Sequence, residues 1–192
     1  SVGQNAEGYV DPVTGGPLNL NFLPHYAVPE LGVMPHTVQA YGLDDPAPTY
    51  SNTNFDPIME FLFQELPHRT VIWHPETAYW VSHDVDVPLF LPLYAERRAS
   101  DLRFLMAEEE LRKKRPTNPL MGHLDGQLTF SSGWEWGYWL NDVITARASW
   151  NPRLASGGQA FVELLEESLG VFGPAKAEVA RLRERPVAAV CT

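Results

Sequence analysis

The fold of this chain is decided by residues 69–88, "RTVIWHPETAYWVSHDVDVP", where a β-branched and apolar run leads into a polar loop. Val71, Ile72 and Trp73 are residue types that fit a buried or half-buried strand, so the run predicts a β-strand over residues 70–74. The loop after it combines histidines and carboxylates with aromatic rings, a mixture that core packing alone does not require. The stretch therefore predicts a strand that ends at one wall of a pocket.

On both sides of this stretch the chain alternates between short apolar runs and helical patterns. A β-leaning run over residues 31–41 precedes a helical pattern over 56–66. After the quoted stretch come a helical pattern over 93–115, a short strand over 126–130 and a further helix over 131–148. The order strand, loop, helix thus occurs three times, which predicts an α/β fold with parallel strands joined by crossover helices.

The chain divides into three segments by pattern. Residues 1–30 mix prolines and glycines without periodicity and are expected to form an irregular N-terminal segment. Residues 31–150 form the predicted β/α core, and residues 151–192 are expected to form C-terminal helices. Three β/α units leave sheet edges and helix faces uncovered, so we expect another polypeptide chain to lie beside this one and complete the fold.

Composition limits the class of partner. The 192 residues suit one globular domain, with 44% apolar and 20% charged residues. The net charge of −10 argues against nucleic acid or an anionic membrane as the main partner. No apolar run approaches the roughly 18 residues that a membrane span needs. A single cysteine, Cys191, excludes an internal disulfide and leaves the cellular compartment open.

Unusual polar and aromatic residues follow each predicted strand and precede each predicted helix. Parallel α/β proteins bring these loops together at the carboxyl ends of their strands, where ligands bind. We therefore expect the three groups of residues to converge in one pocket. They are His36, Asp44 and Asp45; His74, Glu76, His83, Asp84 and Asp86; and Trp134, Glu135, Trp136 and Tyr138.

Two glutamates are the candidates for catalysis. Glu76 follows the strand directly and suits a general acid or a nucleophile, although a carboxylate that braces the loop would fit the same position. Glu135 lies between Trp134 and Trp136, which would exclude water from the carboxyl group and raise its pKa. The tryptophans could equally belong to the core. Flat rings beside carboxylates suit sugars, whose C–H faces stack on aromatic side chains.

Other chemistries have weaker support in the sequence. Imidazole with carboxylate is the ligand set of zinc and iron hydrolases, but no H-x-H or H-E-x-x-H pair is present, so we assign no metal ligand. No phosphate-binding glycine loop and no G-x-S-x-G elbow occurs. No cofactor is expected on these grounds.

Residues 71–80, "VIWHPETAYW", and 128–139, "LTFSSGWEWGYW", make the chain resemble part of a (β/α)8-barrel glycoside hydrolase. In each, a strand leads to a glutamate among aromatic residues. The resemblance implies a TIM-type barrel of which this chain supplies about three units, where a full barrel needs eight. One feature departs from the resemblance. Such enzymes usually carry asparagine directly before the glutamate that acts as the acid, whereas His74 and Pro75 precede Glu76 here.

The resemblance implies hydrolysis of a glycosidic bond by a pair of carboxylates, with Glu135 as proton donor and Glu76 as nucleophile or base. A non-catalytic glycan-binding or structural subunit of a larger complex is an alternative, and a metal-dependent hydrolase is another. The expected ligand is a carbohydrate or another small polar molecule. The expected substrate-binding residues are His74, Tyr79, Trp80, His83, Asp84, Trp134, Trp136 and Tyr138.

Overall fold

The computed structural model describes most of the chain up to residue 152. The described residues are 5–12, 15–37, 41–46, 53–77, 92–130, 135–152, 162–163 and 166–167; the side chains of 5, 92, 93 and 135–140 lie outside the description. The elements are β1 (Asn5–Val10), β2 (Pro17–Asn19), the 3₁₀ helix η1 (Leu20–Tyr26), β3 (His36–Thr37), α1 (Asp56–Glu65), β4 (Ile72–Pro75), α2 (Pro92–Lys113), β5 (Gly126–Gln127) and α3 (Glu135–Trp150).

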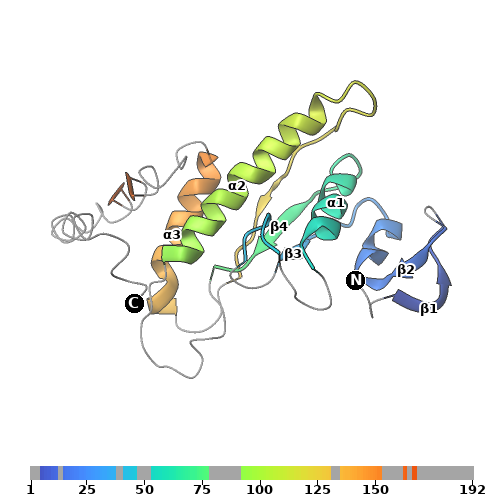
Figure 1. Cartoon of the computed structure of the whole chain (residues 1–192), viewed down its shortest axis with the longest axis horizontal. Coiled ribbons are helices and arrows are strands. Elements are labelled where there is room, and N and C mark those ends of the chain that lie inside the picture. Colours follow the sequence, from blue (N-terminus) through green and yellow to red (C-terminus); the bar gives the residue numbers. More distant parts are fainter. Residues whose placement is uncertain are drawn as a thin grey trace.

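A parallel sheet of three short strands organises the molecule. Its spatial order, β3-β4-β5, is also the order along the chain. In register, His36 lies beside His74, and Ile72 lies beside Gly126. Helix α1 connects β3 to β4 and helix α2 connects β4 to β5, so the carboxyl ends of all three strands meet at one edge (Figure 1).

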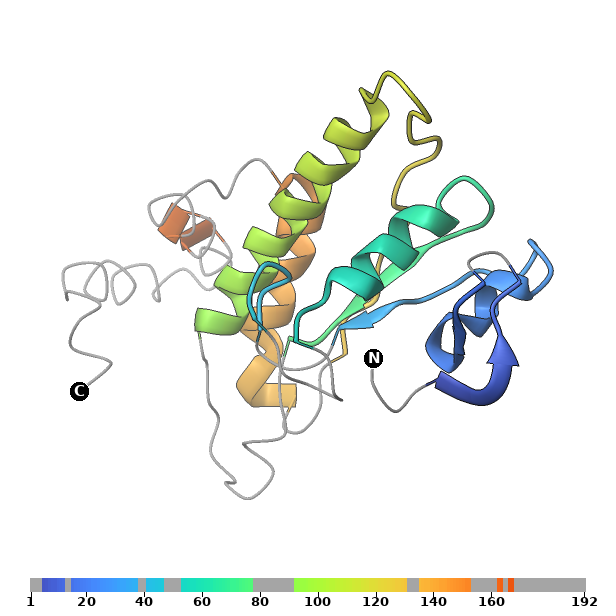
Figure 2. The same ribbon diagram turned by 45° about the vertical axis from the view of Figure 1, so that its right-hand side comes forward.

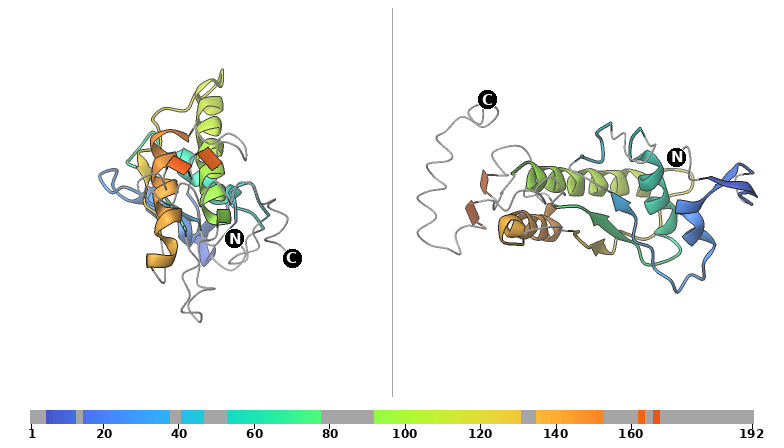
Figure 3. Two further views of the ribbon diagram at one scale, coloured as in Figure 1. Left: turned by 90° about the vertical axis from the view of Figure 1, so that its left-hand side faces the viewer. Right: turned by 90° about the horizontal axis from the view of Figure 1, so that it is seen from below.

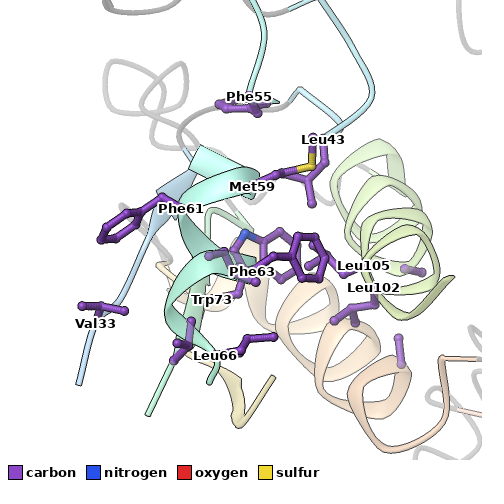
Figure 4. Packing of buried hydrophobic residues seen from close by; sticks show 14 of the residues in the cluster. Val33, Leu43, Phe55, Met59, Phe61, Phe63, Leu66, Trp73, Leu102 and Leu105 are labelled. Atoms are coloured by element: carbon purple, nitrogen blue, oxygen red, sulfur yellow. The ribbon is translucent and has the colours of Figure 1, made fainter. Parts of the chain in front are cut away.

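The core lies between the sheet and the three helices. Because side chains alternate along a strand, Val71, directly before β4, and Trp73 of β4 point to the same face, where both are almost fully buried. Trp73 Nε1 also donates a hydrogen bond of 3.0 Å to Thr37 Oγ1 on β3. Figure 4 shows this cluster, in which side chains of α1 and α2 surround Trp73. The cluster includes Leu43, Phe55, Met59, Leu62, Phe63, Leu66, Leu102, Leu105 and Ile144.

Helices α2 and α3 pack side by side next to the sheet (Figures 1 and 3). Residues 95, 99, 102 and 105 of α2 recur at helical spacing and are buried, as are Ile144 and Ala148 of α3. Among the described helices, none combines the length and the apolar character that crossing a membrane requires.

The prediction of a TIM-type barrel is wrong. The described strands form one sheet of three strands and one of two, and neither closes on itself. Barrel closure depends on a matched strand number, tilt and stagger, and three strands of this length cannot meet that condition. The architecture is a small mixed α/β arrangement in which β3, β4 and β5 pair parallel.

The prediction of an irregular segment over residues 1–30 is also wrong. Strands β1 and β2 pair antiparallel, and η1 follows them directly. Glycine closes the turn between the strands: Gly15 has φ of +71°, and Asp11 N donates to Gly16 O at 2.8 Å. Asn19 then caps η1 by accepting from Asn21 N at 3.0 Å. Figure 2 shows this N-terminal unit beyond α1.

A buried ion pair fastens the N-terminal unit to α1. Glu65 is fully buried at the end of α1, and its two oxygens lie 2.7 Å from Arg69 Nε and 2.5 Å from His25 Nδ1. The remaining guanidinium nitrogens of Arg69 donate to backbone carbonyls at 3.1–3.3 Å. These carbonyls belong to His25, Ala27, Val28 and Leu31. Arg69 therefore joins η1 and its following loop to the core.

Replacing Gly122 by alanine is expected to lower the free energy of unfolding by about 1–3 kcal/mol. Gly122 has φ of +88°, and an added Cβ would lie 2.6 Å from the backbone oxygen of Leu66. Urea unfolding measures the change. The control is Gly126→Ala, because no atom lies within 4 Å of a Cβ there. Equal losses in the two variants would contradict the assignment of strain to Gly122.

Candidate functional site

The best-defined candidate site lies at the carboxyl end of β4. Glu76 follows β4 directly and is only 4% exposed. It forms an isolated parallel bridge with Phe130, and Thr77 N donates to Phe130 O at 2.9 Å. The backbone of Glu76 is thus fixed within the sheet, and its carboxyl group is largely removed from water.

Four residues gather on the sheet face opposite Trp73; we call them the histidine cluster: His36, His74, Glu76 and Phe130. The rings of His36 and His74 have centroids 4.6 Å apart, as expected for paired positions on adjacent strands. The ring of Phe130 meets both histidines edge-on, with centroids 6.1 Å away in each case. Glu76 Oε1 lies 3.4 Å from His36 Nε2. The cluster therefore combines a carboxyl group, two imidazoles and an apolar ring.

Backbone carbonyls fix the tautomers of both histidines. His36 Nδ1 lies 2.9 Å from His74 O, and His74 Nδ1 lies 2.5 Å from Leu128 O. A carbonyl oxygen can only accept a hydrogen bond, so Nδ1 carries a proton in both rings. The other ring nitrogen, Nε2, is then the one left for proton transfer or ligand binding.

A buried charge pair lies in α2, on the core side of the sheet. Arg98 is fully buried; its Nη2 lies 3.1 Å from Asp101 Oδ2 and its Cζ 5.9 Å from the centre of the Trp73 ring. Asp101 also accepts from Leu43 N at 2.7 Å, and Arg98 donates to Tyr41 O. These bonds hold the loop after β3 against α2.

Burial sets the ionisation of this pair. Burial lowers the pKa of Arg98, although its attraction to Asp101 and, more weakly, to Glu76 opposes this. Burial also raises the pKa of Asp101 to about 6, against the effects of Arg98 and the Leu43 N–H. The carboxylates of Asp44 and Asp45 raise it further.

The pKa of Asp101 predicts a pH dependence of stability. Folded Asp101 binds its proton more tightly than the unfolded chain does, so its protonation stabilises the fold below about pH 4, and this contribution is lost as the pH rises through about 6. Relative to Asp101→Asn, the wild type should lose up to about 3 kcal/mol over this range. Urea unfolding of both proteins at several pH values tests this. A difference that does not change with pH would contradict it.

The structure brings together only part of the predicted site. His36, His74 and Glu76 are neighbours in the histidine cluster, whereas Asp44 and Asp45 lie near Asp101. Glu135, Trp136 and Tyr138 belong to α3, in its first turns, where side chains are outside the description. Tyr79, Trp80, His83, Asp84, Asp86 and Trp134 lie outside the described residues.

The expected convergence placed His36 in one pocket with His74 and Glu76, and these three residues are in contact, whereas Phe130 was not expected in the site. His36 was grouped with Asp44 and Asp45, but its contacts are with His74 and Glu76. Phe130 was read as part of a strand only. The signal for Phe130 was its position: it ends the strand predicted over residues 126–130, at the edge where Glu76 also lies.

Two other features of the described residues bear on the site. They contain no group of three or more histidine, cysteine, aspartate or glutamate side chains arranged to hold a metal ion. A depression of about 230 Å³ lies at the opposite end of β4 from Glu76. Its lining is Leu66, Arg69, Thr70, Gly122, His123 and Asp125. Arg69 and Asp125 are already engaged in structural bonds there, so we place the candidate site at Glu76.

Comparisons with protein families, with curated proteins and with solved structures found no match to this chain.

Proposed function

We propose that this chain takes part in hydrolysis of a glycosidic bond, with Glu76 as one of two catalytic carboxyl groups. The observation that carries the proposal is the placement of Glu76: a buried carboxyl group at the carboxyl end of the central parallel strand, 3.4 Å from an imidazole. Ligands of parallel α/β proteins bind at this edge. Phe130 adds an apolar ring on which a sugar face can pack.

Glycosidases use two carboxyl groups in different protonation states. The second in this proposal is Glu135, the first residue of α3, which follows Phe130 closely along the chain. Glu76 would serve as nucleophile or base and Glu135 as proton donor. A separation of roughly 5–5.5 Å between the carboxyl groups would make the enzyme retaining, and about 6.5–9.5 Å would make it inverting.

The proposed partners are a carbohydrate and another polypeptide. In the described part of the chain, β3 and β5 each pair on one side only. Met34 precedes β3 and Leu128 follows β5, and these two side chains are 47% and 53% exposed. Parallel sheets are normally covered on both faces, so a neighbouring polypeptide would bury these side chains. Native mass measurement tests this, and a chain that stays monomeric at all concentrations and binds no copurified protein contradicts it.

The experiment that tests the function is an assay against a panel of aryl glycosides. We expect release of the phenol from at least one of them, and NMR of the first sugar product to show which anomer forms. Separate Glu76→Gln and Glu135→Gln variants should each lose this activity. Binding of a sugar without its hydrolysis would favour the alternative of a glycan-binding subunit. Activity that requires added zinc or iron would favour a metal-dependent hydrolase.

A further inference from the structure

We propose that His36 is a positioning residue for Glu76, and that one proton is held between His36 Nε2 and Glu76 Oε1. The inference rests on the proposed function for its catalytic meaning, but the shared proton can be tested without any substrate. In this proposal, His36 carries protons between the buried carboxyl group of Glu76 and water.

The tautomer of His36 is set by its contact with the backbone. Its Nδ1 lies 2.9 Å from the carbonyl oxygen of His74, so the proton on that nitrogen is committed to the backbone. A neutral ring would then present a lone pair at Nε2. The ring cannot turn over without losing this bond, and Phe130 packs edge-on against it.

The Nε2 atom of His36 faces the carboxyl group of Glu76. Glu76 Oε1 is 3.4 Å away, and an ionised carboxylate also presents lone pairs. Two lone pairs at this distance inside a poorly solvated site would repel each other. The contact is favourable when a proton lies between them, either as imidazolium with carboxylate or as imidazole with carboxylic acid. The distance is longer than a strong hydrogen bond, as catalytic contacts often are before substrate binds.

The side chains of His36 and Glu76 differ in their exposure to water. The His36 side chain is 36% exposed, whereas the Glu76 side chain is 5% exposed. Water therefore reaches the imidazole and scarcely reaches the carboxyl group. A proton that Glu76 Oε1 gives up or takes can therefore pass to or from His36 Nε2, and His36 can exchange it with solvent.

Within the described ranges, charged or titratable groups from three elements act on the pair. His36 belongs to β3, His74 and Glu76 to β4, and Arg98, which attracts Glu76 electrostatically, to α2. His74 supplies its carbonyl oxygen to His36, while its own Nδ1 is bonded to Leu128 O. His74 is thus a matched control: it has the same ring, a neighbouring position and the same kind of backbone bond.

The test is an NMR titration of the Glu76 carboxyl carbon and the His36 ring nitrogens in the intact chain. If they share a proton, both signals should change together over the same pH interval. His36→Asn keeps an N–H for the His74 carbonyl but removes Nε2, so the Glu76 midpoint should shift. In His74→Asn the coupled change should persist. Should His36→Asn fail to fold, as judged by urea unfolding, the wild-type titration still decides the question.

Independent titration of the two groups, or an unchanged Glu76 curve in a folded His36→Asn variant, overturns the proposal. These outcomes can be told apart from failure of the proposed function, which would appear as no glycoside hydrolysis by the wild type. Where hydrolysis is observed, His36→Asn should remove one limb of its pH profile and lower kcat more than it changes KM.

Discussion

Replacing Arg69 by methionine is expected to lower the free energy of unfolding by about 3–5 kcal/mol. The substitution leaves the carboxylate of Glu65 buried and, of its two ionic partners in the described part of the chain, keeps His25 alone. It also removes the donors for four backbone carbonyls in residues 25–31. A loss of this size is a large share of the stability of a small domain, typically about 5–15 kcal/mol. Urea unfolding followed by tryptophan fluorescence measures it.

A matched control comes from the surface of the molecule. Lys114 forms an ion pair with Glu110 in which both side chains are more than half exposed, so Lys114→Met should change stability by less than about 0.5 kcal/mol. In the double variant Glu65→Leu/Arg69→Met, much of the loss should be recovered, because neither charge is then left buried alone. An Arg69→Met variant as stable as Lys114→Met would show that this ion pair does not hold the N-terminal unit.

The sequence predicts the individual elements of the core well. The strand expected over residues 70–74 is β4, and the helix expected over 56–66 is α1. Both have strong local signals: the β-branched run around Val71 and Ile72, and Pro57 in the first helical turn. These features act within a few residues, so they can be recognised without knowing the rest of the structure.

The architecture was harder to predict because it depends on distant residues. The barrel expectation extrapolated from a local order of strands and helices to a closure that the described strands do not make. A glycine pair among prolines without periodicity indicates irregular structure when only local sequence is considered, but Gly15 and Gly16 belong to the turn between two paired strands.

The site, too, could be predicted only where local sequence determines it. Glu76 could be selected from its position after a strand, but its contact with His36 depends on the register between β3 and β4. A shift of one residue would place either side chain on the other face of the sheet. Nothing local in the sequence fixes that register, so the pairing of His36 with Glu76 required the structure.

Changing Glu76 to glutamine is expected to lower kcat for glycoside hydrolysis by about 10²–10⁴-fold. Glutamine has nearly the same shape, but it can neither transfer a proton nor attack the sugar, so substrate binding should change little. The matched control is Glu96→Gln, an exposed position on α2 distant in sequence from the histidine cluster, which should keep wild-type activity. Urea unfolding of each variant shows whether any loss of activity reflects loss of the fold.

The central claim, that the buried carboxyl group of Glu76 performs hydrolysis, is tested most directly by kcat measured side by side for the wild type, Glu76→Gln and Glu96→Gln on the best aryl glycoside of the panel. The predicted result is hydrolysis by the wild type and Glu96→Gln, with kcat for a folded Glu76→Gln variant lower by at least about 100-fold. Equal kcat values for all three proteins, or a wild type that hydrolyses no member of the panel, would contradict the claim.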